Sequence, residues 1–187
     1  KFSNMLGKIN QKTVVIISDA LRYGCAMELV DELNKDPRRK TSITPMISTI
    51  PSYTALGMSA LLPHQEIKYE DSVILEDGRK TRSLDERNQQ LKAYYKNSLS
   101  FNYDDLKHLK RDDLKESVGD SNLIYIYHNQ IDARGDNSAT ENEVFKAAQE
   151  AIDEIVDLIT KLKNSIGFSK FYITADHGFI YKKNKLE

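Results

Sequence analysis

The sequence has one cysteine, no tryptophan, four prolines and eight glycines in 187 residues. A single cysteine excludes an internal disulfide and is typical of a reducing compartment. No stretch approaches the ~20 apolar residues of a membrane span, and no signal peptide is visible. The net charge of −1 gives no overall signature of a polyanion partner, although a local cleft is compatible with nucleic acid. We therefore expect a cytoplasmic protein without membrane association.

Four apolar, β-branched stretches predict strands, at residues 13–18, 41–49, 122–127 and 169–174. Helical patterns separate them, over residues 20–35, over 55–62 with Thr54 as N-cap, and after a capping box of Thr140 and Glu143. This alternation predicts an α/β fold, with a mainly parallel sheet and helices on both of its faces.

Residues 64–118 have little apolar content. A hairpin is predicted around Asp77-Gly78, a polar helix after the capping box of Ser83 and Glu86, and a charged helix over 103–116. We expect residues 64–118 to be a polar insertion over the core of a single domain, 1–187. The chain begins with Lys1 and ends soon after a motif-rich segment, so we expect it to be a fragment of a longer protein.

Polar side chains follow all four predicted strands. The first strand is followed by Asp19, the second by Thr54, the third by His128, Asp132 and Asp136, and the fourth by Asp176 and His177. Because ligands of such sheets bind beyond the carboxyl ends of the strands, we expect these side chains to share one region. Clustered carboxylates repel one another unless divalent cations neutralise them. Asp with His suits Zn or Mn, and a carboxylate-rich set also suits Mg.

Each of these residues also has a simpler explanation when taken alone. Asp19 and Thr54 could be residues that cap helices, and His128 could be a core histidine. Arg22 could pair with a carboxylate of the first helix, and Cys25 reads as a small buried hydrophobe. Only their joint placement at the strand ends favours a site.

Four stretches, in order between residues 14 and 179, carry a resemblance to a known family. They are VVIISDALRYGCAMEL, TPMISTIPSYTALGMSALLPH, YIYHNQIDARGD and ITADHGF. They resemble the PglZ domain, which belongs to the alkaline phosphatase superfamily and is found in bacterial phage-defence systems of the BREX type. The resemblance implies an alkaline phosphatase-like core, which we expect to be incomplete at the C-terminus.

The resemblance also implies two divalent metal ions, Zn, Mn or Mg. One would be held by Asp19, Thr54, Asp176 and His177. The other would be held by Asp132, Asp136 and a late histidine. Asp136 stands where many superfamily members have histidine, and the late histidine has no counterpart in this sequence. The second site is therefore expected to be incomplete.

The implied function is a metal-dependent phosphoester hydrolase, of phosphodiesterase or nuclease type, with Thr54 as nucleophile. Arg22 or Arg134 could clamp a phosphate oxygen. The expected partners are a phosphoester substrate, with DNA as one candidate, and other phage-defence proteins. Two alternatives stay open: a phosphomonoesterase, and a non-catalytic, metal-stabilised scaffold of a defence complex.

Overall fold

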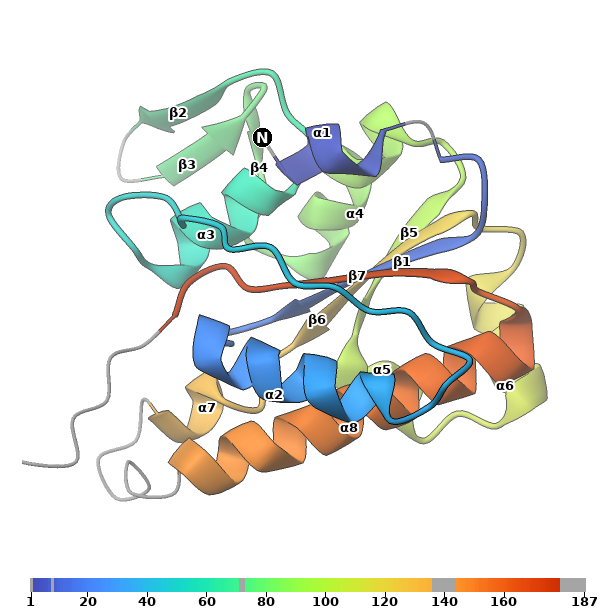
Figure 1. Ribbon diagram of the computed structural model, residues 1–187. Helices are drawn as coiled ribbons and strands as arrows, with labels where there is room; N and C mark the ends of the chain where they lie inside the picture. Colours follow the sequence, from blue (N-terminus) through green and yellow to red (C-terminus); the bar gives the residue numbers. More distant parts are fainter. Residues whose placement is uncertain (1, 8, 71–72, 136–143, 179–187) are drawn as a thin grey trace, which may run out of the picture.

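A four-stranded parallel sheet forms the centre of the computed structural model, which describes residues 2–7, 9–70, 73–135 and 144–178 (Figure 1). The strand order is β5-β6-β1-β7. The bounds are β5, Ser98–Asn102; β6, Leu123–His128; β1, Thr13–Ser18; and β7, Lys170–Thr174. Every residue of β1 and β6 is buried, which explains why these strands read as continuous apolar runs in the sequence.

Helices cover both faces of the sheet, as the sequence predicts. One face packs against α2 (Tyr23–Asn34), α5 (Tyr103–Lys107), α6 (Arg111–Val118) and α8 (Val144–Ile166). The other packs against α1 (Phe2–Leu6), α3 (Thr54–Leu61) and α4 (Leu84–Tyr94). Cys25 is buried in the first of these two cores, as expected of a small hydrophobe.

A small antiparallel sheet lies beside α3, with strands β2 (Ile67–Glu70), β3 (Val73–Glu76) and β4 (Arg79–Lys80). Its predicted turn is confirmed: Asp77 and Gly78 both have positive φ, at 50° and 78°, as a two-residue hairpin of this kind requires. The predicted capping box is also confirmed, since Ser83 and Glu86 bond reciprocally at the start of α4.

Two strand predictions need correction. Residues 41–49 form no strand; they are irregular chain on the β7 side of the sheet. The fourth strand of the sheet is instead β5, which lies within the stretch 64–118. From Ser98 onward this stretch is part of the main fold, because Leu106, Leu114 and Val118 belong to its core. The division of the chain into a core and an insertion stays a prediction.

Three helix boundaries also differ from the sequence prediction. The first helix starts at Tyr23 rather than at residue 20, because Ala20 has a φ of +62°. Thr54 is the first residue of α3 and Tyr53 is its N-cap. The charged helix expected over 103–116 is two helices, α5 and α6. The capping box of Thr140 and Glu143 lies outside the described residues.

Within the described ranges, none of the helices is both long enough and apolar enough to span a bilayer.

A buried carboxyl group, Glu76, joins the small sheet to α3. Its Oε1 accepts a hydrogen bond from Thr81 Oγ1 at 2.6 Å, and Thr81 Oγ1 lies 3.1 Å from Ser59 Oγ of α3. Burial raises the pKa of Glu76 to about 7, against the opposing effect of these hydroxyl groups. The folded protein therefore binds a proton at Glu76 that the unfolded chain releases at lower pH.

This proton predicts a pH dependence of stability. A carboxyl group whose pKa is higher in the folded protein than in the unfolded chain stabilises the fold when it is protonated. This stabilisation is complete at pH values below the pKa of the group in the unfolded chain, and it is lost as the pH rises through about 7. Between about pH 4.5 and pH 7.5, the free energy of unfolding should fall by up to about 3 kcal/mol more in the wild type than in Glu76→Gln. Urea denaturation of both proteins across this range measures the difference. If the free energy of unfolding changed equally with pH in both proteins, the prediction would be wrong.

Candidate functional site

Three neighbouring strands end at the same edge of the sheet and bring the predicted site residues together. Asp19 follows β1, α7 (Asp132–Gly135) follows β6, and Asp176 and His177 follow β7. Because β1 lies between β6 and β7 and all three run parallel, their carboxyl ends are adjacent. The sheet therefore positions these side chains on rigid elements.

The imidazole of His177 is the centre of the cluster. Its Nε2 lies 3.3 Å from Asp19 Oδ1, 3.6 Å from Asp176 Oδ2 and 3.9 Å from Asp132 Oδ1. Thr54 Oγ1, at the start of α3, is 3.0 Å from the same nitrogen. Three residues, Asp19, Asp132 and His177, each offer one ligand atom. These three atoms lie within 4.8 Å of one another, which is close enough to share one metal ion.

A local hydrogen bond favours one tautomer of the His177 ring. Its Nδ1 lies 3.0 Å from the carbonyl oxygen of Gly178, and a carbonyl can only accept. Nδ1 therefore carries the hydrogen, and in the neutral ring Nε2 keeps its lone pair. That lone pair can accept the hydroxyl hydrogen of Thr54 or bind a cation, and the Nδ1 bond fixes the ring orientation for either role.

The carboxylates of the cluster are buried close together. Asp19 Oδ1 and Asp176 Oδ2 are buried, and neither has a hydrogen-bond partner among the described residues. Burial raises the pKa of Asp19 to about 8, and the charges of Asp176 and Asp132 add to the shift. Buried oxygens with no donor, facing an imidazole lone pair, form a set that a divalent cation would satisfy. The residues present therefore fit a metal ion.

The turn after β1 positions Asp19 and contacts Asp176. The Asp19 N–H donates to the carbonyl of His128 at 2.8 Å, which extends the pairing of β1 with β6 by one bond. Ala20, with its positive φ, then turns the chain so that its N–H donates to Asp176 Oδ1 at 3.3 Å. One short turn thus positions carboxylates that follow two different strands.

Gly57 allows α3 to approach the strand end. A Cβ at Gly57 would lie 2.5 Å from the carbonyl oxygen of Asp176 and 2.8 Å from its Cβ. Only a residue without a side chain fits here, because the added Cβ would meet backbone atoms of Asp176 and its Cβ, which cannot move away independently of the backbone. This contact brings the first turn of α3, with Thr54, beside Asp176 and His177.

The remaining candidates lie elsewhere or make other contacts. Arg134 pairs with Glu150 Oε2 at 2.6 Å, and the Arg22 guanidinium lies 5.5 Å from the centre of the Phe145 ring. A phosphate-binding role for either stays a prediction. Asp136 lies outside the described residues.

The other histidines do not join the cluster. His128 is a buried core residue between Ser18 Oγ, 3.0 Å from its Nδ1, and Glu154 Oε2, 2.8 Å from its Nε2, and burial lowers its pKa. His64 Nδ1 donates to the carbonyl of Leu62, and His108 is an exposed residue at the end of α5.

Sequence reasoning missed one charged neighbour of the site, Arg87 of α4. Its Nε–H donates to the carbonyl of Thr81 at 3.0 Å, and its guanidinium lies 4.5 Å from the centre of the Tyr127 ring. Tyr127 of β6 is paired with Ile17 of β1, which comes two residues before Asp19, so Arg87 lies near Asp19. The positive charge of Arg87 opposes the rise in the pKa of Asp19. No signal in the sequence indicates this, because α4 reads as part of a polar insertion.

A parallel sheet with a carboxylate–imidazole cluster and a threonine hydroxyl at its carboxyl edge is the arrangement expected of an alkaline phosphatase-like domain. The chain belongs to the PglZ family: residues 1–187 match the family described as the BREX system PglZ alkaline phosphatase-like domain.

Two curated relatives support this assignment. The chain is 41% identical over 178 residues to the alkaline phosphatase-like protein PglZ of Bacillus cereus (strain H3081.97), covering 95% of this chain and 21% of that protein. It is 37% identical over 179 residues to the alkaline phosphatase-like protein BrxZ of Escherichia coli O9:H4 (strain HS), covering 94% of this chain and 20% of that protein. The chain thus spans about a fifth of the length of these relatives.

The close packing at Gly57 generates a test. Gly57→Ala should destabilise the protein by about 1–3 kcal/mol and weaken metal binding, because the methyl group must displace the backbone of Asp176. The matched control is Gly24→Ala in α2, where the nearest atom to the added Cβ is Arg22 Nε at 4.0 Å. That substitution should be neutral or stabilising. If Gly57→Ala and Gly24→Ala had equal effects on thermal unfolding and on metal binding measured by calorimetry, the close packing of Gly57 against Asp176 would not be what these properties depend on.

Proposed function

We propose that the full-length protein is a metal-dependent phosphoester hydrolase with Thr54 as its nucleophile. The observation that carries the proposal is the 3.0 Å contact between Thr54 Oγ1 and His177 Nε2, inside a cluster of three carboxylates. A threonine hydroxyl is a weak nucleophile unless a neighbouring base or metal ion activates it. The contact places Thr54 beside a set of residues that would hold such an ion.

The proposed metal ligands are residues that already face one another. Asp19, Asp132 and His177 offer ligand atoms to a shared ion, and Asp176 adds a buried oxygen beside them. Zn²⁺ and Mn²⁺ suit this mixture of carboxylate and imidazole. When bound, such an ion supplies Lewis-acid stabilisation of negative charge on a phosphoryl oxygen. A second ion involving Asp132 and Asp136, of Zn, Mn or Mg, is part of the proposal.

The roles of the chain's own groups follow from their positions. His177 Nε2 has a single lone pair, so in the metal-bound protein it would be a ligand rather than the base for Thr54, and the bond from Nδ1–H to the Gly178 carbonyl keeps the ring aligned for that role. An ion held beside Thr54 would promote loss of its hydroxyl proton. The N–H groups of the first turn of α3 have no partner within the helix, so they can bind the oxygens of a phosphoryl group next to Thr54. Thr54 thus lies where phosphate binding and nucleophile activation coincide.

We further propose a phosphodiester substrate, with DNA as a candidate, and a role in phage defence alongside other proteins of the BREX system. The family description supports the association with BREX, and the alkaline phosphatase-like names of the relatives support hydrolase chemistry. A phosphomonoesterase and a metal-stabilised scaffold are the competing functions. The nucleophile experiment below separates both enzymes from the scaffold, which would also bind metal, and a comparison of monoester with diester substrates separates the two enzymes.

Metal binding can be measured directly on the full-length protein. Calorimetric titration with Zn²⁺ or Mn²⁺ should show binding that Asp132→Asn weakens by more than ~10-fold, because it replaces an anionic carboxylate with a neutral amide. Metal should also raise the melting temperature, and a chelator should reverse this. Asp112→Asn, at an exposed position of α6, is the matched control and should bind as the wild type does. Equal affinities in the two variants would rule out the proposed ligand set.

The nucleophile is tested by two substitutions at one position. Thr54→Ala should lower kcat for a chromogenic phosphodiester by at least ~1,000-fold while metal binding persists, and Thr54→Ser should retain part of the activity. Thr44→Ala, at an exposed threonine, is the control. A Thr54→Ala protein with wild-type kcat would remove Thr54 from the chemistry. If no variant or wild type hydrolyses phosphoesters and Thr54→Ala still supports defence in cells, the scaffold function gains.

A further inference from the structure

Asp132 is the carboxylate of the candidate site that the sheet supports least directly. Asp19 follows the last residue of β1, whereas Asp132 comes four residues after the end of β6, at the start of the short helix α7. Its side chain is also the most exposed of the three carboxylates, at 19% against 5% for Asp19 and 0% for Asp176. The position of Asp132 therefore depends on what holds α7.

A helix as short as α7 is not stable by itself, because the first helical turn is costly to form. Backbone bonds within the segment run from the N–H of Ala133 to the carbonyl of Asn129 at 3.4 Å, and from the N–H of Arg134 to that of Ile131 at 3.2 Å. Ile131 is buried in the core between the sheet and α8, so it anchors the inner side of the segment. A single anchor leaves the segment able to turn about it, so the direction of the Asp132 side chain needs a second one.

Glu150 of α8 supplies this second anchor. Its Oε2 accepts a hydrogen bond from Gln130 Nε2 at 3.0 Å and pairs with Arg134 Nη2 at 2.6 Å. Gln130 comes two residues before Asp132 and Arg134 two residues after it, so a single carboxylate oxygen binds both flanks of the proposed ligand. We call Glu150, Gln130 and Arg134 the carboxylate clip. Hydrogen bonds to an ionised carboxylate are stronger than those between neutral groups.

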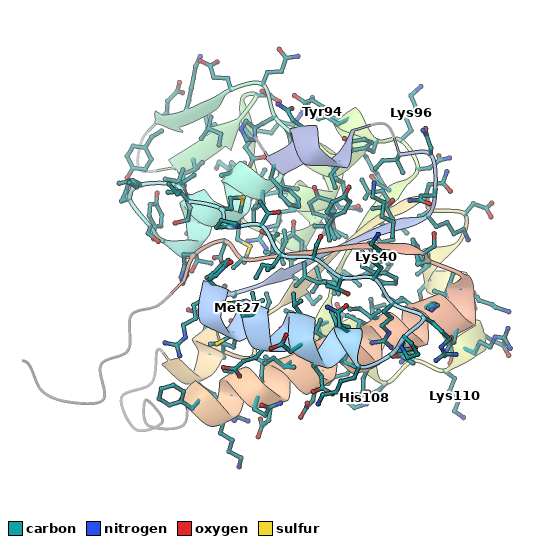
Figure 2. All side chains as sticks on the ribbon, in the orientation of Figure 1. Met27, Lys40, Tyr94, Lys96, His108 and Lys110 are labelled. Carbon is teal, nitrogen blue, oxygen red and sulfur yellow. The ribbon has the colours of Figure 1, made fainter. Side chains whose placement is uncertain are left out.

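The carboxylate clip is attached to a rigid part of the fold. Helix α8 buries Ala151, next to Glu150, in the core that it shares with the sheet, and it contacts α2, α6 and α7. Figure 1 shows α7 beside the start of α8, and Figure 2 labels Met27 on the neighbouring α2. Asp132 is thus held from two sides, by Ile131 in the core and by Glu150 on the helix.

We propose that Glu150 is a positioning residue for the candidate metal site, which fixes Asp132 in the orientation that a shared ion requires by binding Gln130 and Arg134. The inference rests on the proposed function, because it takes Asp132 as a metal ligand. In this role Arg134 holds α7, and the phosphate-binding role predicted for it from the sequence is not needed.

The carboxylate clip is expected to matter for metal affinity more than for stability. The side chains of Arg134 and Glu150 are 29% and 35% exposed, and ion pairs in contact with water contribute little to the free energy of unfolding. A residue that orients a metal ligand, in contrast, strongly affects metal affinity. This difference separates a positioning role from a merely structural one.

Calorimetric titration of the metal-free, full-length protein with Mn²⁺ tests the carboxylate clip. Glu150→Ala should weaken Mn²⁺ binding by about 10-fold, because Asp132 loses its support. The melting temperature of the metal-free protein should stay within about 2 °C of the wild type. The matched control is Asp153→Ala, which removes an exposed carboxylate that bonds Gln149 of the same helix. It should bind Mn²⁺ as the wild type does.

A charge swap separates positioning from a simple loss of charge near the site. Arg134→Glu and Glu150→Arg should each weaken Mn²⁺ binding. The double variant restores the ion pair in reverse at an unchanged net charge, so it should recover most of the affinity. If the double variant bound Mn²⁺ as weakly as the single variants, charge alone would explain the effect and the proposal would be wrong.

Asp132→Asn distinguishes failure of this inference from failure of the proposed function. If Asp132→Asn weakens Mn²⁺ binding and Glu150→Ala does not, the metal site stands and the role of Glu150 is overturned. If neither variant weakens binding, the proposed ligand set is wrong, and the role of Glu150 is wrong with it. A melting temperature of Glu150→Ala several degrees below that of the wild type would assign the carboxylate clip to the stability of the fold, which would also overturn the proposal.

Discussion

The crowding of three carboxylates around one imidazole is the constraint on which the rest of this structure depends. Asp19 and Asp176 are almost fully buried, and charges this close in a region of low polarity oppose folding unless a proton or a cation neutralises them. The sheet must therefore be stable enough to hold them. Two fully buried central strands, β1 and β6, supply that stability, and their apolar side chains pack against helices on both faces.

Much of the fold could be predicted from the sequence because its signals are local. The strands β1, β6 and β7, the Asp77-Gly78 turn and the Ser83–Glu86 capping box each depend on a few neighbouring residues. The errors arose where tertiary context decides the outcome. Strand β5 has a short and partly polar sequence, and its pairing with β6 makes it a strand. Residues 41–49 have strand composition but pair with no strand of the described chain.

More of the candidate site than of the surrounding fold could be predicted from the sequence. A residue after a buried strand has a known position once the sheet is parallel, so Asp19, Asp132, Asp176 and His177 could be grouped from sequence order. Thr54 reaches the cluster although the strand expected before it is absent, because Gly57 lets α3 pack directly on Asp176. The position of Arg87 depends on how α4 packs, and no periodicity in the sequence encodes that.

The bond between the Ala20 N–H and Asp176 joins residues 156 positions apart. A ribosome must therefore release nearly all of these residues before the two strand ends can meet, and chains shortened within β7 cannot assemble the cluster at all. Contacts of such long sequence separation also form late in folding, because loop closure opposes them. The complete set of candidate ligands would thus form only after this whole region has left the ribosome, so chains terminated before the end of β7 would lack Asp176 and His177.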